Sequence, residues 1–563
     1  MVKRRGCSAV TVATAMSVLL LAGCSGGSTA DRPLAATSGP AEPGKSAEGG
    51  PVVEAPGQTP NGQHGKPRPS APPKPRDDVP TGWGTTTGEE EAARLAVDAM
   101  SDKELAGQVI VAGYAGTEPP VELVEELNLA GVIVMGDNYV SVDATREANS
   151  RLQHADDRPW PLVISVDQEG GIVSRIGKPM TQFPTYMSLG ASGDLQLARR
   201  AARANGEELR AAGFTMVFAP DADVTVGASD PTIGSRSAGD DAEQVAAVVA
   251  ASTRGYVQSG IVPVLKHFPG HGSVTSDSHL TLPHQSASVD ALERRDFRPF
   301  QAAVGAGAPA VMMAHISVDQ VAPGVPADLA PQLVGLLRED VGFGGLIVTD
   351  ALEMQAVAAE YGADESAVAA LRAGSDLLLM PPDAEAARAG ILAALHDGSL
   401  ERQRVEDAAA KVVALMMHEA AAADVPAELI GSHEDLARAV SARALTVIDG
   451  SCQGPYVGGR VTASGDPEAV RAFDAAAAAS GLQTGSGTSV ALIGAFGNPA
   501  SADIVISLDT PYVLASSSAA VAKLALFGST RPAMDALVAV LTGQARPRGR
   551  LPVAVPGLKP PAC

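Results

Sequence analysis

Short apolar runs alternate with helical patterns between residues 86 and 422 of this 563-residue chain. Each run is four or five residues long and almost continuously apolar, which is typical of strands buried on both faces of a parallel sheet. The eight runs are 109–112, 131–135, 162–166, 215–219, 262–265, 310–314, 346–349 and 376–380. Between most of them, Ala, Leu, Glu and Arg recur at helical spacing, as in 195–211 and 241–256. Eight strand–helix units predict a (β/α)8 barrel over residues 86–422, with an open doubly wound sheet as the structural alternative.

The pattern changes near residue 423, where a second region begins. Helical and strand-like stretches alternate there at 436–447, 469–479, 490–494, 504–508, 523–527 and 533–541. Residues 423–563 are long enough for one more small domain. We expect the barrel to be followed by a smaller α/β/α sandwich domain.

The first 23 residues have the pattern of an export signal. Lys3, Arg4 and Arg5 precede an apolar stretch at 9–22, which is too short to span a bilayer comfortably. The stretch ends in Leu-Ala-Gly-Cys at 21–24, which resembles the bacterial lipobox, in which the cysteine is lipidated. We expect residues 1–23 to be a lipoprotein signal peptide and Cys24 the lipidated residue. An ordinary signal peptide followed by a chance cysteine is the alternative.

Residues 24–85 are predicted to be a disordered, Pro/Gly-rich tether. Residues 25–80 hold 12 of the 41 prolines and no aromatic side chain, so they cannot bury enough apolar surface to offset the entropy of ordering. The tether and signal are net positive, with nine Lys or Arg against six Asp or Glu in residues 1–85. The whole chain has a net charge of −22, so residues 86–563 carry −25, and so acidic a body should repel the phosphate backbone of a nucleic acid.

Polar side chains follow most of the predicted strands directly. They are Asp137, Asn138, Asp167, Asp221, Asp223, Lys266, His267, His315 and Asp350. Catalytic groups of such barrels lie at the carboxyl ends of the strands. A concentration of Asp, Lys and His at these positions favours an enzyme over a binding scaffold.

The stretch that holds the most candidate catalytic side chains runs from Lys266 to His279. A Pro-Gly pair at 269–270 predicts a loop, and this loop carries Lys266, His267, His271, Asp277 and His279. Asp277 can bond one imidazole nitrogen of His279, which fixes the tautomer and raises the basicity of the ring. A zinc site built from His267, His271 and His279 is the alternative, but Lys266 is an awkward neighbour for a cation, and we expect no metal.

Asp350 ends the predicted strand 346–349 and is the second candidate for chemistry. A carboxylate between a cleft and low-dielectric walls needs cations to stay ionised, and Lys266, Arg236 and Arg175 are candidates. A helix N-cap role for Asp350 is the alternative.

Together these motifs resemble glycoside hydrolase family 3, in its bacterial β-N-acetylglucosaminidase (β-hexosaminidase) branch. The resemblance spans about residues 95–420 and rests on five motifs in family order. They are Asp-Gln-Glu-Gly-Gly at 167–171 with Arg175, Arg-Ser at 236–237, Lys-His-Phe-Pro-Gly-His-Gly at 266–272, Asp-Ser-His at 277–279 and Thr-Asp-Ala at 349–351. The segment 525–553 is similar to the close of the family's second domain.

The resemblance implies a role for each matching residue. Asp350 matches the catalytic nucleophile, His279 the acid/base and Asp277 its orienting partner. Asp167, Arg175, Arg236, Lys266 and His267 match positions that hold hydroxyls of the N-acetylglucosamine ring. His271, Asp223 and His315 are expected to support the cleft.

The resulting expectation is a membrane-anchored, exo-acting, retaining β-N-acetylglucosaminidase that removes N-acetylglucosamine from the non-reducing ends of peptidoglycan fragments. It would act as a monomer without a cofactor, anchored through Cys24 to the outer face of the cell membrane. The alternatives are a family 3 β-glucosidase or β-xylosidase, a phosphorylase with the same site, and a non-catalytic lipoprotein that binds wall glycans. An exported protein permits disulfides, and we expect one between Cys452 and Cys563.

Overall fold

The computed structural model describes residues 78–559, 561 and 563. The predicted signal peptide, the lipidation of Cys24 and most of the predicted tether lie outside the described residues. Trp83 and Thr85, which the sequence assigned to the tether, are buried, and the Trp83 indole donates a hydrogen bond to Glu90 (3.1 Å). The predicted start of the packed region at residue 86 is therefore a few residues too late. No helix in the described part of the chain is long and apolar enough to cross a membrane.

All eight predicted strands form one parallel sheet, in the order β11-β9-β7-β6-β3-β2-β1-β12. Their bounds are β1 (Ile110–Ala112), β2 (Gly131–Val134), β3 (Val163–Val166), β6 (Met216–Val217), β7 (Val262–Phe268), β9 (Ala310–Met313), β11 (Leu346–Thr349) and β12 (Leu378–Leu379). Leu377 bonds Ile347 and Thr349 of β11, which brings the two edge strands together. The closed ring confirms the predicted (β/α)8 barrel and excludes an open sheet.

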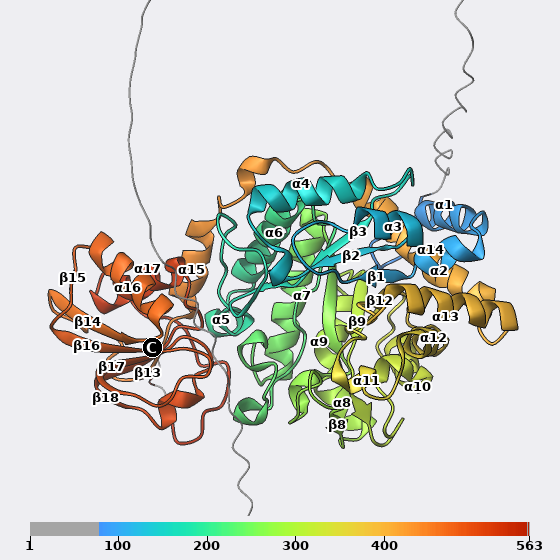
Figure 1. Cartoon of the computed structure of the whole chain (residues 1–563). Coiled ribbons are helices and arrows are strands. Elements are labelled where there is room, and N and C mark those ends of the chain that lie inside the picture. The colour runs from blue at the N-terminus through green and yellow to red at the C-terminus, as the bar shows by residue number, and fades with distance from the viewer. Residues whose placement is uncertain (1–77, 560, 562) are drawn as a thin grey trace, which may run out of the picture. The chain divides into compact units, whose positions relative to one another are not determined.

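Helices surround this ring (Figure 1). They are α1 (Thr87–Asp98), α2 (Asp102–Gly107), α3 (Val121–Leu127), α4 (Val142–Gln153), α5 (Tyr186–Ser192), α6 (Leu195–Ala211), α7 (Ala242–Ser259), α8 (Val289–Arg294), α9 (Phe297–Val304), α10 (Pro331–Glu339), α11 (Gln355–Ala358), α12 (Ala363–Ala373), α13 (Ala384–Asp397) and α14 (Arg402–Ala420). Side-chain caps start several of them, and Asp194 accepts hydrogen bonds from two backbone N–H groups at the start of α6. Gly260 (φ 85°) ends α7 in the left-handed conformation that favours glycine.

Strand β7 is longer than the sequence predicted. The apolar run ends at Leu265, yet the strand continues through Lys266 and His267 to Phe268, with all seven residues buried. The sequence placed Lys266 and His267 in the following loop, which is a wrong assignment. Both polar side chains can lie in a buried strand because each has a partner inside the barrel. Lys266 forms ion pairs with two carboxylates, and His267 is hydrogen-bonded to Asp223.

The second region contains a six-stranded sheet in the order β13-β18-β17-β16-β14-β15. The strands are β13 (Thr446–Asp449), β14 (Arg460–Gly465), β15 (Gln483–Thr484), β16 (Thr488–Ile493), β17 (Ser501–Ser507) and β18 (Ser518–Ala525), and the helices are α15 (Glu434–Ala444), α16 (Pro467–Ala479) and α17 (Arg531–Leu541). Only β13 is antiparallel to its neighbour.

The two faces of this sheet are covered by different parts of the chain. Helices α16 and α17 pack on one face around Phe473 and Leu537 (Figure 1). Met187 of the barrel helix α5 packs on the other face, together with Val553 and Val555 from the C-terminal segment. The predicted sandwich is thus completed by a helix of the barrel. Cys452 and Cys563 are joined by a disulfide with a Cα–Cα distance of 5.4 Å.

Candidate active site

A cavity of about 370 Å³ opens at the carboxyl ends of the barrel strands. Its wall brings together all eight side chains that the sequence singled out as catalytic or substrate-binding. They are Asp167, Arg175, Arg236, Lys266, His267, Asp277, His279 and Asp350. Asp137 is exposed outside this cavity wall, and Asn138 braces a loop by donating to the carbonyls of Tyr114 and Gly116.

Asp350 sits directly after β11, and its carboxylate is oriented by its own backbone. The N–H of Ala351 donates a hydrogen bond to Oδ1 of Asp350 (2.8 Å). Among the described residues nothing donates to Oδ2, so this oxygen is left to face the cavity. Burial alone would raise the pKa of Asp350, but the cation His315, the backbone N–H of Ala351 and the cation Lys266 hold it below its ordinary value.

His315 is the main cation behind Asp350, where the sequence had suggested Lys266, Arg236 and Arg175. Its Nδ1 lies 3.0 Å from Oδ1 of Asp328, and its Nε2 lies 2.8 Å from the carbonyl oxygen of Ala351. Both ring nitrogens face acceptors, which favours a doubly protonated imidazolium. Burial opposes that charge, but Asp328 and Asp350 raise the pKa of His315 to about 9.

Asp277 and His279 form the predicted pair. Nδ1 of His279 lies 2.8 Å from Oδ1 of Asp277, and the backbone N–H of His279 donates to the same oxygen (3.0 Å). This arrangement fixes the proton on Nδ1 and leaves Nε2 available to exchange a proton. The His279 side chain is 62% exposed, so it can reach a group at the cavity mouth. Behind this loop, Nε2 of His271 bonds the hydroxyl of Ser278 (2.9 Å).

A lattice of alternating charges forms the cavity floor. Nε and Nη2 of Arg236 donate to the two oxygens of Glu169, each at 2.9 Å. Nζ of Lys266 lies 2.5 Å from Asp167 and 2.7 Å from Glu169. Burial alone would raise the pKa of Glu169, but Arg236 and Lys266 lower it to about 2. These ion pairs hold Arg236, Lys266 and Asp167 in fixed positions around one small space.

His267 is held as a neutral acceptor at the edge of this lattice. Its Nδ1 lies 2.7 Å from Oδ2 of Asp223, and its Nε2 lies 3.4 Å from Nη2 of Arg236. Burial and the nearby Arg236 lower the pKa of His267 well below its ordinary value. Asp223 also accepts from the backbone N–H groups of His271 and Gly272, so one buried carboxylate shapes the whole 267–272 turn.

Arg175 contributes an unsatisfied donor to the cavity wall. Its backbone N–H donates to the Gln168 side chain (2.8 Å), while its buried Nε has no partner among the described residues. A buried donor without a partner is costly, so it indicates a place where a polar ligand atom fits.

The alternative zinc site does not form as the sequence suggested. Each of the three histidines is bonded elsewhere: His267 to Asp223, His271 to Ser278 and His279 to Asp277. Across the described residues the possible metal-ligand group consists of Asp221, Asp223 and His267. Arg236 lies within 3.6 Å of Asp221, so a fixed cation already balances this acidic group.

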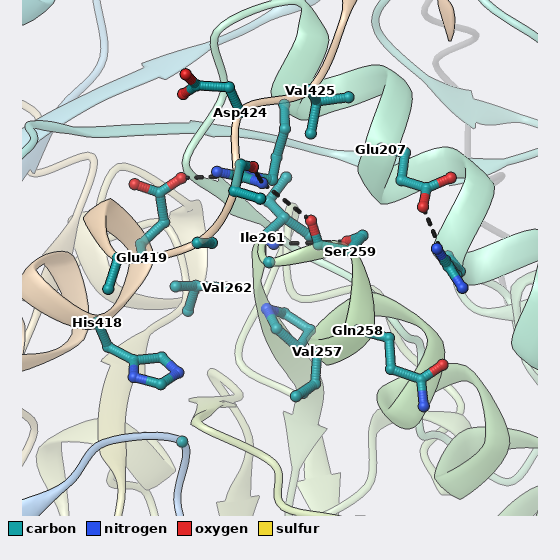
Figure 2. A pocket seen from close by; sticks show the side chains of 18 of the residues that line it. Glu207, Val257, Gln258, Ser259, Ile261, Val262, His418, Glu419, Asp424 and Val425 are labelled. Atoms are coloured by element: carbon teal, nitrogen blue, oxygen red, sulfur yellow. Dashed lines mark hydrogen bonds and ion pairs between the residues drawn. The ribbon is translucent and has the colours of Figure 1, made fainter.

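A larger cavity of about 510 Å³ lies at the opposite end of the barrel, beside the beginnings of β7 and β9 (Figure 2). Its floor is apolar, with Ile261 and Val262 in view. Its main charged groups are paired with each other, since Nε of Arg210 lies 3.3 Å from Glu419 and Nε of Arg203 lies 2.7 Å from Glu207. The predicted site residues line the other cavity, which is therefore the candidate active site.

Sequence reasoning missed the importance of Glu169 and Asp328. Glu169 lies two residues after Asp167, and the period of a strand places alternate side chains on the same side, so the Asp-Gln-Glu motif did carry a signal for it. Asp328 lies in a short 3-10 helix (Ala327–Leu329) with no distinguishing motif, and only the fold brings it to His315.

Comparison with known proteins agrees with this geometry. Residues 102–415 match the model of the glycosyl hydrolase family 3 N-terminal domain. The β-hexosaminidase of Stenotrophomonas maltophilia is 36% identical over 48% of this chain and 83% of its own length. The β-hexosaminidase LpqI of Mycobacterium tuberculosis is 32% identical over 54% of this chain and 82% of its own.

Among solved structures, a glycoside hydrolase family 3 β-N-acetylglucosaminidase from a Paenibacillus strain superposes with a TM-score of 0.73 at 29% identity. That match covers 81% of this chain and 99% of the other. The similarity therefore extends beyond the barrel into the second sheet.

Proposed function

This chain belongs to glycosyl hydrolase family 3 and is a glycoside hydrolase, and from that premise we propose that it is an exo-acting, retaining β-N-acetylglucosaminidase. The observation that carries the proposal is the single cavity in which Asp350, the Asp277–His279 pair and the Asp167–Lys266–Glu169–Arg236 lattice meet. The names of the most similar relatives point to the same substrate class.

In the first step, Oδ2 of Asp350 attacks the anomeric carbon and the glycosidic C–O bond breaks. Nε2 of His279 gives its proton to the leaving oxygen, while Asp277 stabilises the imidazole ring through Nδ1. The product of this step is a glycosyl ester on Asp350 and a free leaving group. The lowered pKa of Asp350 keeps the attacking carboxylate ionised.

In the second step, His279 takes a proton from water, and the resulting hydroxide oxygen attacks the same anomeric carbon. The ester bond to Asp350 breaks, which releases N-acetylglucosamine and restores both side chains. The sugar hydroxyls are held by Asp167, Arg175, Lys266, His267 and Arg236. Buried ion pairs fix Arg236, Lys266 and Asp167 before the substrate arrives, which is the preorganisation that such catalysis needs.

We also propose that the natural substrates are peptidoglycan fragments that end in N-acetylglucosamine, and that the protein acts as a monomer anchored by lipid at Cys24 outside the cell membrane. The export signal, the Leu-Ala-Gly-Cys motif and the Pro-rich residues 25–80 of the sequence support this setting.

The test compares release of nitrophenol from the N-acetyl-β-glucosaminide and from the β-glucoside. We expect turnover of the acetylated substrate, abolished in Asp350→Ala and reduced about 100-fold or more in His279→Ala. His284→Ala is a matched control, because His284 forms a similar exposed pair with Asp319 (2.9 Å, 60% exposed) away from the cavity. A 5-fluoro analogue of the sugar should leave a covalent adduct on the peptide that contains Asp350.

Three outcomes would contradict the proposal. Equal turnover of the glucoside would indicate a broader β-glycosidase, and formation of N-acetylglucosamine 1-phosphate on addition of phosphate would indicate a phosphorylase. No turnover of either substrate by folded protein would favour a glycan-binding role.

A further inference from the structure

Phe496 is an aromatic side chain with no packing partner of its own domain's core. It is 96% exposed, the highest value among the large hydrophobic residues of the described chain, yet it lines the cavity that holds Asp350 and His279. It comes from the second domain, in the segment that joins β16 to β17. A fully exposed phenyl ring at the mouth of a polar cavity is the kind of feature that marks a binding surface.

The backbone holds Phe496 at the tip of a tight turn. The N–H of Gly497 donates to the carbonyl of Gly494 (3.1 Å), which places Ala495 and Phe496 in the two central positions. A side chain at Gly497 would approach Ile493 to 2.5 Å, so the turn closes tightly on β16. Because Phe496 is also one of the residues that line the cavity, this turn places its side chain at the cavity.

A second exposed apolar side chain lies at the same cavity. Ile172 is 51% exposed and lines the cavity wall. The deep part of the cavity differs in character, since it is formed by the buried ion pairs of Asp167, Glu169 and Lys266. The cavity thus has a polar floor for one sugar ring and an exposed apolar rim, formed by Phe496 and Ile172.

We propose that Phe496 and Ile172 form a leaving-group subsite that binds the sugar ring attached to the departing oxygen. Pyranose rings have an apolar face of C–H groups, and an aromatic ring is the side chain that packs best against such a face. The proposal rests on the proposed glycosidase function and adds the substrate class: a glycan of at least two rings, rather than an N-acetylglucosaminide of any small alcohol.

The exposure of these side chains supports this assignment. His279 must contact the departing oxygen, and its side chain is exposed in the same cavity wall as Phe496 and Ile172, whereas Lys266 and Glu169 of the floor are buried. The part of the substrate that extends past the floor is the leaving group. The second domain would thereby contribute a specificity-determining residue to a site that otherwise belongs to the barrel.

The test compares two substrates that share the transferred sugar. N,N′-Diacetylchitobiose has a sugar leaving group, whereas N-acetyl-β-glucosaminyl fluoride has a leaving group too small to reach the rim. We expect Phe496→Ala to lower kcat/KM about three- to ten-fold on the disaccharide and to leave the fluoride unchanged. Phe496→Trp should retain the wild-type ratio of the two substrates.

Val521→Ala is the matched control, since Val521 is an exposed apolar residue of the same domain (43% exposed) that does not line the cavity. Equal effects of Phe496→Ala on both substrates, or none on either, would overturn the subsite while the proposed function stands. If wild-type protein cleaves neither substrate, the proposed function fails and the subsite fails with it.

Discussion

Asp350 and His315 share one buried electrostatic environment. His315 bonds the carbonyl of Ala351, and the N–H of the same residue bonds Asp350 Oδ1, so one peptide group links the cation to the carboxylate. The cations that face Asp350 are His315 and Lys266, with the neutral His267 beside them, and His315 lowers the pKa of Asp350 most. His315 in turn carries its charge because Asp328 and Asp350 raise its pKa to about 9.

We therefore expect His315→Gln to change the pH dependence of catalysis. Glutamine can still donate to the Ala351 carbonyl, but it carries no charge, so the pKa of Asp350 should rise toward its ordinary value. Attack requires the ionised carboxylate, and the acid limb of kcat/KM against pH should move to higher pH. An acid limb that stays in place, as it should in His284→Gln, would contradict this account.

Glu169 is the common counterion of Arg236 and Lys266, and its side chain is only 1% exposed. We expect Glu169→Gln to lower the free energy of unfolding by about 3–5 kcal/mol, because two buried cations lose their shared carboxylate. KM should also rise, since both cations are proposed to hold the substrate. Chemical denaturation and steady-state kinetics measure the two effects.

The matched control for that change is Glu207→Gln, whose partner Arg203 is 56% exposed. An exposed pair of this kind contributes about 0–1 kcal/mol. Similar losses of unfolding free energy in the two variants would show that the buried ion pairs of Glu169 stabilise the protein no more than an exposed pair does.

At the residue scale, the sequence predicted which side chains would lie together better than it predicted their hydrogen-bond and ion-pair partners. Asp350, His279 and Lys266 follow a motif and lie together in the structure, because strand ends converge in a closed barrel. The partnership of His315 with Asp328 could not be predicted, since no pattern in the chain relates a strand end to a buried carboxylate in a 3-10 helix.

Among the elements, the eight barrel strands were predictable because a strand buried on both faces must be almost continuously apolar. The polar end of β7 was not, since Lys266 and His267 lie in the strand only through ion pairs and hydrogen bonds to distant residues. Strands β14 and β15 were also missed. Both have exposed residues at their bounds and therefore lack a strong apolar pattern.

The disulfide anchors the C-terminal segment, which packs on one face of the second sheet. Val553 and Val555 pack there with Met187, and the bond to Cys452 fixes the chain a few residues beyond them. The bond closes a loop with a sequence separation of 111 residues. We expect its loss to lower the free energy of unfolding of this domain by about 2–4 kcal/mol.

The measurement is denaturation of wild type and of the Cys452→Ser, Cys563→Ser double variant, each with and without reductant. Reductant should lower the midpoint of the wild type to that of the variant and leave the variant unchanged. A wild-type midpoint that does not respond to reductant would contradict the stabilising role.

At the scale of the whole molecule, the two domains meet beside the loop that carries Arg236. The hydroxyl of Ser235, next to Arg236, donates to Asp509 of the second domain. A few residues on, the N–H of Asp240 donates to the carbonyl of Pro552 (3.2 Å), and its carboxylate accepts from the N–H of Ala554 (2.6 Å). The sequence predicted two domains but could not predict this junction, which depends on single polar contacts between distant segments.

These contacts have a consequence for anyone who recombines modules of this family. The β-hexosaminidase from Stenotrophomonas maltophilia aligns with 48% of this chain and 83% of its own length, so it corresponds to little more than the barrel. In the present chain, however, the segment that carries Arg236 is anchored from outside the barrel, by Asp509, Pro552 and Ala554. A chimera that joins a foreign second domain to this barrel must therefore reproduce those three contacts, or the loop that carries Arg236 will lose its support from outside the barrel.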